Sequence, residues 1–183
     1  MARAVFLDRD GVLNRVIFRH GRACPPESVD ELQILPGVTR ACASLRRAGF
    51  ALIVVTNQPD VARGSVQKET VERINSELRE RLPLDDVRVC FHDDCDNCAC
   101  RKPAPGLILQ AAVDWNINLG ASFMVGDRWK DIEAGRRAGC RTILIHDREA
   151  REESFSPDHC ASSLLEGTGW ILDQIQPSRE GAE

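Results

Sequence analysis

Two aspartates near the start of the chain have a spacing that suits paired catalytic carboxylates. The apolar run 4–7 is followed by Asp8 and Asp10, one residue apart, and then by Gly11. In an extended chain, side chains two residues apart point the same way. Placing two carboxylates at the end of a buried strand is unfavourable in free energy. Such a pair is therefore expected to bind a cation or to take part in proton transfer. One could attack phosphorus while the other handles the proton of the leaving group. An ordinary acidic turn would contain the same residue types.

Further polar groups follow three other apolar runs that predict strands. In chain order they are Thr56, Asn57 and Gln58 after 50–55, Arg101 and Lys102 after 87–91, and Asp127, Arg128 and Asp131 after 122–125. Each run is followed by a helical pattern, and this alternation implies parallel strands joined by right-handed crossovers. The polar groups then meet at the carboxyl edge of one sheet, where open α/β folds bind ligands. We expect a site for a metal-bound phosphate at this edge.

The elements that position these groups can be placed by their patterns and by Pro and Gly punctuation. We expect helices over 38–48, 67–81, from 106 onward, over 129–138 and over 164–175, a fifth strand over 141–145, and a polar linker over 147–160. The fold class is α/β, a Rossmann-like parallel sheet with helices on both faces and no separate cap domain. We expect one domain over 1–175, with a flap at about 15–35 above the active edge and a flexible tail over 176–183.

Composition excludes several function classes. The 183 residues carry a net charge of −4 and are 43% hydrophobic, which fits one globular domain. The sequence contains no basic stripe, so we do not expect nucleic acid as a partner. No apolar stretch approaches the ~20 residues of a membrane span. The N-terminus shows no signal-peptide pattern, so eight cysteines indicate thiols or metal ligands and not disulfides. We expect a cytoplasmic monomer.

A cysteine-rich loop offers a second metal site. Cys90, His92, Cys98 and Cys100 supply three thiolates and one imidazole within eleven residues, a sufficient tetrahedral set for structural zinc. Such a closed site, the zinc loop 90–100, would pin the chain so that Arg101 and Lys102 reach the active edge. Cys95 is a fourth thiol in the loop that could be a bystander or a competing ligand. The alternative is a loop of reduced cysteines. The other four cysteines read as ordinary thiols, with Cys42 and Cys140 expected to be buried.

The order of these motifs resembles the haloacid dehalogenase-like phosphohydrolases. The motifs are Asp8-x-Asp10, Thr56, Lys102 and Gly126-Asp127-x-x-x-Asp131, and the resemblance covers most of residues 4–146. The added signature Cys90-x-His92 with Cys98-x-Cys100-Arg101-Lys102-Pro103 is similar to the zinc-containing branch of D-glycero-D-manno-heptose 1,7-bisphosphate 7-phosphatases and histidinol phosphatases. The resemblance implies a Mg²⁺-dependent phosphatase with a structural Zn²⁺.

Roles can then be assigned residue by residue. Asp8 is the expected nucleophile and would form an aspartyl-phosphate. Asp10 would protonate the leaving oxygen and then activate water, and its backbone carbonyl would join Asp8 and Asp127 as a Mg²⁺ ligand. Thr56 would hydrogen-bond a phosphoryl oxygen, and Lys102 would neutralise charge. We expect Asp131 to hold Lys102 or a metal-bound water.

Substrate contacts fall to residues beside this set. We assign Asn57 and Gln58 to substrate binding, and the heptose branch implies the same for Arg101 and Arg128, which suit a second anionic group. The main expectation is removal of the 7-phosphate of D-glycero-D-manno-heptose 1,7-bisphosphate. Histidinol phosphate or another small phosphomonoester is the alternative substrate. A non-catalytic phosphate-binding or zinc-organised interaction module is the second alternative, although a pure binder has no need of Asp10.

Overall fold

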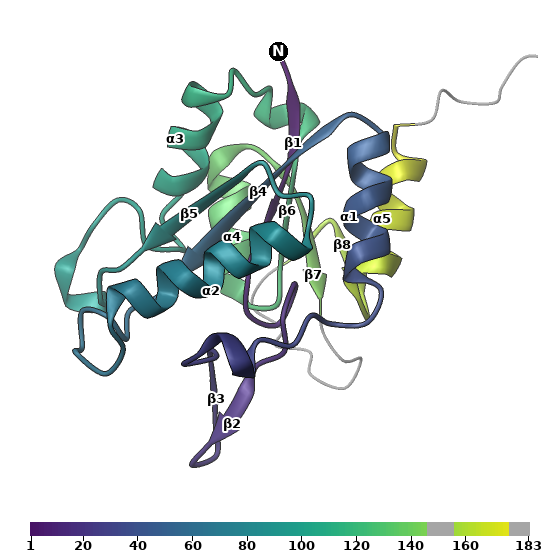
Figure 1. The fold of residues 1–183 in the computed structure, drawn as a ribbon. Coiled ribbons are helices and arrows are strands. Elements are labelled where there is room, and N and C mark those ends of the chain that lie inside the picture. The colour runs from purple at the N-terminus through teal and green to yellow at the C-terminus, as the bar shows by residue number, and fades with distance from the viewer. Residues whose placement is uncertain (146–155, 176–183) are drawn as a thin grey trace, which may run out of the picture.

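A parallel sheet forms the centre of the protein in the computed structural model, which describes residues 1–145 and 156–175. Its six strands lie in the order β5-β4-β1-β6-β7-β8, and every neighbouring pair is parallel. The strands are β1 (Arg3–Leu7), β4 (Phe50–Asn57), β5 (Asp86–Cys90), β6 (Phe123–Gly126), β7 (Arg141–Ile145) and β8 (His159–Ala161). Because all six run the same way, their carboxyl ends meet at one edge (Figure 1).

The central strands are apolar on both sides because helices cover both faces of the sheet. Along β1, Val5 and Leu7 belong to one core cluster, whereas Ala4 and Phe6 belong to the other. All four side chains are fully buried. Continuous apolar runs of this kind are typical of parallel strands buried on both faces. The expected Rossmann-like α/β class is therefore confirmed for the described chain.

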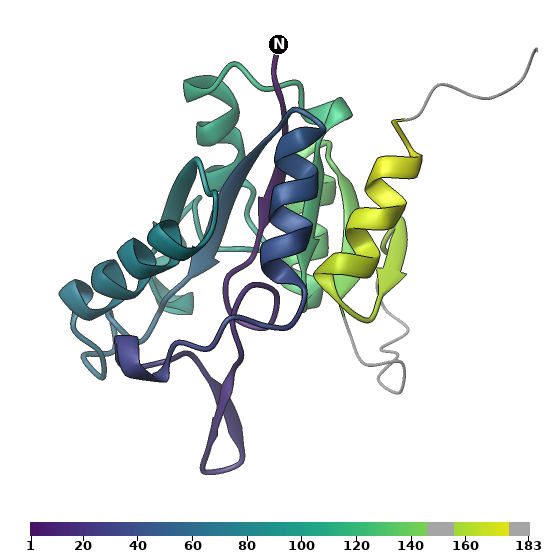
Figure 2. The same cartoon turned by 45° about the vertical axis from the view of Figure 1, so that its right-hand side comes forward.

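The helices divide between the two faces. Residues of α1 (Val38–Arg47), α2 (Lys68–Arg81) and α5 (Leu164–Asp173) pack in one cluster. Residues of α3 (Gly106–Asp114) and α4 (Trp129–Ala138) pack in the other. Figure 2 shows α1 and α5 side by side on their shared face. The predicted helices thus form within a residue or two of the expected bounds, and Gly139 ends α4 in the left-handed conformation with φ 85°.

The expected flap contains a small antiparallel hairpin. Strands β2 (Ile17–Arg19) and β3 (Arg22–Cys24) pair with each other and project from the carboxyl edge of the main sheet (Figure 1). The turn between them uses positive φ at His20 and Gly21. A 3₁₀ turn, η1 (Val29–Glu31), follows. Glu31 accepts hydrogen bonds from the Arg19 guanidinium at 2.6 Å, which ties the hairpin to this turn.

One element was wrongly predicted as part of a linker. The expected linker 147–160 overlaps β8, which adds a sixth strand beside β7 through Ile143–His159 and Leu144–Cys160 pairing. The segment has only three residues and lacks the apolar alternation that marks longer strands. Residues 146–155 and the predicted tail 176–183 lie outside the described residues. None of the helices in the described ranges is long and apolar enough to cross a bilayer.

Candidate active site and metal centre

The carboxyl edge of the sheet brings the predicted catalytic side chains together around one cavity. Asp8 follows β1, Thr56 lies at the end of β4, and Asp127 follows β6. Asp131 lies in the first turn of α4, and Lys102 follows the zinc loop. A cavity of about 310 Å³ opens here. Its lining includes Asp8, Asp10, Thr56, Asn57, Gln58, Arg101, Lys102, Arg128 and Asp131.

Lys102 is the electrostatic centre of this arrangement. Its Nζ lies 2.7 Å from Asp8 Oδ1 and 2.5 Å from Asp131 Oδ1. It also donates to the carbonyl oxygen of Val55 at 2.8 Å. The side chain is only 4% exposed. A buried ammonium needs such compensation, since an unpaired buried charge is strongly unfavourable. Asp131 thus contacts Lys102 directly, which is one of the two roles that the sequence analysis left open for it.

Burial and crowding shift the pKa values of the carboxylates. Burial is the largest cause raising the pKa of Asp8 to about 6, and Asp131 and Asp10 add to it while Lys102 opposes it. Burial, followed by Asp8 and Asp131, raises the pKa of Asp127 to about 7. Burial alone would lower the pKa of Lys102, but the two aspartates raise it above its ordinary range. The site therefore carries more buried negative charge than one lysine neutralises.

The same carboxylates fit a divalent cation. One oxygen from each of Asp8, Asp127 and Asp131 lies within 4.8 Å of the others. The Oδ1 atom of Asp127 is buried and accepts no hydrogen bond from the described residues. Hard oxygen ligands and uncompensated negative charge suit Mg²⁺. Asp131 thus lies close enough to belong to the oxygen cluster, in addition to its contact with Lys102.

Asp10 is held by three side chains that the sequence patterns did not assign to it. Gln58 Nε2 donates to its Oδ2 at 2.8 Å, and Asn14 Nδ2 donates to its Oδ1 at 2.9 Å. Arg9 Nε contacts both oxygens at 3.2 Å, and Arg9 Nη1 donates to Asn75 of α2 at 3.0 Å. Arg9 is fully buried. The carboxylate of Asp10 is therefore fixed beside Asp8.

The residues at the end of β4 support the site more than they line it. Asn57 Nδ2 donates to the Lys102 carbonyl, and the Lys102 amide donates to Asn57 Oδ1, both at 3.1 Å. Gln58 Nε2 also donates to Thr56 Oγ1 at 2.9 Å. The amides expected to bind substrate are thus already engaged in holding Lys102, Asp10 and Thr56. Thr56, Asn57 and Gln58 all still border the cavity.

Two glycines make this packing possible. A Cβ atom at Gly126 would overlap the Asp131 side chain, and one at Gly11 would overlap the Asp127 carboxylate. Gly11 also has φ +88°, a conformation that L side chains rarely adopt. The glycines beside the aspartates therefore let the carboxylates approach the backbone.

The two arginines expected to bind substrate differ in their surroundings. Arg101 is 11% exposed, and its Nε donates to Asp94 Oδ1 at 2.8 Å. Arg128 is 59% exposed, with Nε 3.9 Å from Asp127 Oδ1. Both border the cavity, together with Arg63 and Lys130, which the sequence patterns left unassigned. Together these four side chains, Arg63, Arg101, Arg128 and Lys130, form a wall of cations around the cavity.

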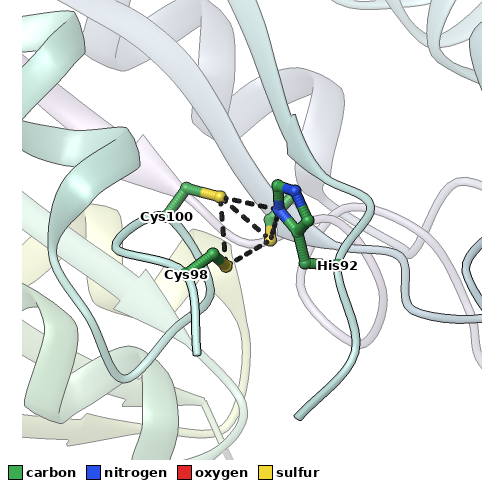
Figure 3. A group of neighbouring side chains, drawn as sticks. His92, Cys98 and Cys100 are labelled. Carbon is green, nitrogen blue, oxygen red and sulfur yellow. Dashed lines mark hydrogen bonds between the residues drawn. The ribbon is translucent and has the colours of Figure 1, made fainter. Parts of the chain in front are cut away.

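The predicted zinc ligands converge on one point. Figure 3 shows the His92 imidazole and the thiols of Cys98 and Cys100 turned toward one another. Cys100 Sγ lies 3.2 Å from Cys90 Sγ, 3.4 Å from Cys98 Sγ and 3.3 Å from His92 Nδ1. Cys90 Sγ lies 3.6 Å from His92 Nδ1 and 3.7 Å from Cys98 Sγ. Ligand atoms about 2.0–2.3 Å from a tetrahedrally coordinated ion lie roughly 3.3–3.8 Å from one another. The donor set fits one zinc ion.

The remaining cysteines lie elsewhere. Cys95 is exposed on the 3₁₀ turn η2 (Asp94–Asp96), outside the group of four ligand atoms. Cys42 and Cys140 are buried, as expected. Burial raises the pKa of each of these two thiols to about 12, so both stay protonated near neutral pH.

Comparison with known proteins gives relatives across nearly the whole chain. A family model described as HAD-hydrolase-like matches residues 99–167. The chain is 35% identical to the D-glycero-D-manno-heptose-1,7-bisphosphate 7-phosphatase of Chlorobaculum tepidum, over 94% of this chain and 96% of the relative. It is 38% identical to the D-glycero-beta-D-manno-heptose-1,7-bisphosphate 7-phosphatase of Escherichia coli K12, over 96% and 97%.

Solved structures agree with these relatives. The D,D-heptose 1,7-bisphosphate phosphatase of B. bronchiseptica, complexed with magnesium and phosphate, superposes with a TM-score of 0.81 at 28% identity, covering 94% of this chain and 99% of that one. A D,D-heptose 1,7-bisphosphate phosphatase from Burkholderia thailandensis has a TM-score of 0.65 at 25% identity, covering 96% and 99%.

Proposed function

The chain belongs to the HAD-like family of heptose bisphosphate phosphatases and is a phosphomonoester hydrolase, and we propose that it removes the 7-phosphate of D-glycero-D-manno-heptose 1,7-bisphosphate through an aspartyl-phosphate. The observation that carries the mechanism is the contact of Lys102 with Asp8 at the cavity. One oxygen from each of Asp127 and Asp131 lies within 4.8 Å of the Asp8 carboxylate. The names of the relatives support the substrate.

Each half-reaction uses groups that lie together at the cavity. A carboxylate oxygen of Asp8 attacks phosphorus, the bond to the sugar oxygen breaks, and Asp10 gives that oxygen its proton. Water then attacks the phosphoryl group of the aspartyl-phosphate, Asp10 takes a proton from the water, and phosphate leaves with Asp8 restored. Lys102 and the Thr56 hydroxyl stabilise negative charge on the phosphoryl oxygens.

We propose two metal ions in this enzyme. Mg²⁺ would be held by Asp8, Asp127 and the backbone carbonyl of Asp10. It would offset the charge of the phosphoryl oxygens. Zn²⁺ would be held by Cys90, His92, Cys98 and Cys100 as a structural ion. The donor sets described above support both assignments, and the magnesium in the B. bronchiseptica relative supports the first.

The cavity offers positive charge for the second phosphate of the substrate. Arg101 and Arg128 border the cavity on the zinc-loop side and the α4 side. Their guanidinium groups suit bidentate contacts to a phosphate that is not being hydrolysed. Among the described residues that line the cavity, none favours histidinol phosphate over this substrate.

The test is phosphate release by the wild-type protein and the Asp8→Asn variant. Asparagine keeps the shape of the side chain and removes the nucleophilic carboxylate, so turnover should fall by at least about 1,000-fold while the fold is retained. Wild-type protein should prefer the heptose bisphosphate over histidinol phosphate and a simple monoester. Turnover by D8N near the wild-type rate would reject the mechanism, and a preference for histidinol phosphate would reject the substrate.

A further inference from the structure

Lys130 is a cation of the cavity wall that the catalytic scheme does not use. It is the second residue of α4 and borders the cavity with a side chain that is 34% exposed. Its Nζ lies 5.9 Å from the centroid of the Trp129 ring and 3.6 Å from Asp94 Oδ1. These two contacts hold the ammonium group at the cavity, so the side chain does not extend freely into solvent.

The carboxylate of Asp94 joins Lys130 to Arg101. The same oxygen, Oδ1, accepts a hydrogen bond from Arg101 Nε at 2.8 Å and pairs with the Lys130 ammonium. Arg101 lies in the chain just after the zinc ligands, whereas Lys130 belongs to α4, so one acid connects two elements. Arg101 and Lys130 border the cavity and Asp94 does not. Asp94 thus contacts both cations without occupying the space that a ligand would fill.

The neighbouring residue, Asp93, holds a third cation, Arg63, at the cavity in the same way. Asp93 pairs with Arg63 through both carboxylate oxygens, at 2.6 and 2.7 Å. Arg63 borders the cavity and Asp93 does not. Asp93 also accepts the backbone N–H of Asp94 and begins η2, so its position is fixed by the loop itself. Two consecutive acids of the zinc loop therefore hold cations at the cavity wall.

We propose that Lys130 joins Arg101 in binding the second anionic group of the substrate, and that Asp94 positions both cations for this task. This inference rests on the proposed phosphatase function and extends it by one specificity-determining residue, Lys130, and one positioning residue, Asp94. The ligand chemistry is a phosphate monoester carried on the same molecule as the phosphate that is hydrolysed.

Positioning is favourable because long cationic side chains lose considerable rotamer freedom when they bind. Ordering a lysine or arginine side chain costs more conformational entropy than ordering a short side chain. A carboxylate that already holds both side chains at the wall removes part of this loss from the binding step. The opposite effect is also present, since a nearby negative charge weakens the attraction for an anion. The two effects predict opposite signs for removal of the Asp94 charge, so an experiment can separate them.

The first test is the Lys130→Gln variant. With zinc-loaded enzyme, kcat/KM for the heptose bisphosphate should fall about 10-fold, chiefly through KM, because a charge-assisted contact to the second phosphate is lost. The value for a matched heptose 7-monophosphate should change less than about 2-fold. Arg136→Gln on the same helix is the control, since Arg136 pairs with Glu133 away from the cavity. Equal losses for both substrates, or no loss, would overturn the role of Lys130.

The second test is the Asp94→Asn variant, which keeps the size of the side chain and removes its charge. If Asp94 positions the two cations, the variant should lower kcat/KM about 3–5-fold for the bisphosphate and leave the monophosphate value unchanged. The fall should be smaller in a Lys130→Gln background, because the two residues act on one contact. A higher kcat/KM would mean that the charge of Asp94 only opposes the substrate, which overturns the positioning role. Asp114→Asn, an exposed acid paired with Arg88, is the matched control.

Two readouts separate this inference from the proposals on which it rests. Zinc content of each variant should equal that of the wild type, which shows that the loop is intact; a D94N protein that lost zinc would reject a pure positioning role. If wild-type protein hydrolyses neither substrate, the proposed function fails. If it hydrolyses both substrates with equal kcat/KM, the second anionic subsite fails while the phosphatase stands.

Discussion

Three side chains converge on the carboxylate of Asp10, and their geometry suits a group that must transfer a proton along a fixed path. Gln58 and Asn14 are both nearly inaccessible to solvent, and each donates to a different oxygen of Asp10. A general acid must lie within hydrogen-bond reach of the leaving oxygen. We therefore expect Gln58 to act through Asp10 and not through the substrate.

Replacing Gln58 with leucine tests this expectation. Loss of its contacts to Asp10 and Thr56 should lower kcat/KM for the sugar phosphate by about 10- to 100-fold, since proton transfer contributes about 10²–10⁴-fold to such rates. The value of kcat/KM reports the first half-reaction, in which an aryl phosphate with a good leaving group needs little proton transfer, so kcat/KM for the aryl phosphate should fall far less. Steady-state kinetics on both substrates measure the difference. Equal losses on the two substrates would assign Gln58 to folding or to phosphate binding.

Sequence patterns predict which residues meet at the carboxyl edge better than they predict the residues that hold them in place. Asp8, Lys102 and Asp127 follow strands, so a parallel sheet must bring them together. Arg9 carries no such signal, because its role depends on Asn75, a residue of α2 that lies 66 positions away. The only hint is a cation between two acids in a turn next to a buried strand.

At the level of elements, the zinc loop links the predicted zinc ligands to Lys102. Gly106 of α3 donates to the carbonyl of Ala99 in the loop, and a Cβ at Gly106 would overlap that carbonyl. The loop is therefore packed tightly against α3. Lys102 leaves this loop directly and reaches Asp8. Disorder in the loop should therefore displace Lys102 without unfolding the core, which lies between the sheet and its helices.

The cysteine variants test the ligand assignment. Cys98→Ser should lose most of the zinc, and hydrogen exchange should rise within 90–102 but stay slow in β1 and β4. Cys95→Ser is the matched control and should retain one zinc per chain, because Cys95 lies outside the ligand group. Metal analysis of protein purified without chelator measures the zinc. Zinc-free wild-type protein, or zinc loss in C95S alone, would contradict the assignment.

Helix α5 forms despite two glycines, and these differ in their surroundings. An added Cβ at Gly169 meets no atom within 4 Å, whereas one at Gly167 would lie 3.3 Å from Ile143 Cγ2. Gly in a helix is about 0.5–1 kcal/mol less stable than Ala. Gly169→Ala should therefore raise Tm by roughly 1–4 °C. Gly167→Ala should gain less or lose stability because it crowds β7. Thermal unfolding of both variants measures this, and an equal gain would contradict the packing argument.

The strand missed by sequence reasoning shows the limit of local patterns. β8 is three residues long, and its stabilisation comes from pairing with β7 and from α5 packing above it. His159 also stacks on Trp170 of α5, with ring centroids 4.8 Å apart. These contacts are tertiary, so a window of the sequence around 159–161 contains no periodic signal.

For the molecule as a whole, the order of strands and helices determines where the site must lie. Parallel strands with helical crossovers place all carboxyl ends at one edge, and this rule predicts the meeting of residues from β1, β4 and β6. It does not predict the wall of cations around the cavity. Arg63 and Lys130 reach that wall because acids of the zinc loop hold them, and such pairings depend on loop geometry.

The buried charges of the site also couple catalysis to stability. Lys102 contacts Asp8 and Asp131 with almost no exposure, so replacing it with methionine leaves buried carboxylates without their cation. Breaking a buried ion pair in this way typically costs about 3–5 kcal/mol, so Tm should fall on the order of 10 °C. Lys68→Met, an exposed lysine paired with Glu72, should change stability by less than about 0.5 kcal/mol.

Magnesium should partly reverse this loss. A cation that binds the native carboxylates and not the unfolded chain stabilises the fold in proportion to the logarithm of its concentration. Thermal unfolding of Lys102→Met with increasing Mg²⁺ should show a larger rise in Tm than the wild type, because the variant has more negative charge left to neutralise. If Tm of the variant does not respond to Mg²⁺, the three carboxylates do not form a cation site. If Tm of the variant equals that of the wild type without Mg²⁺, Lys102 does not neutralise the buried aspartates.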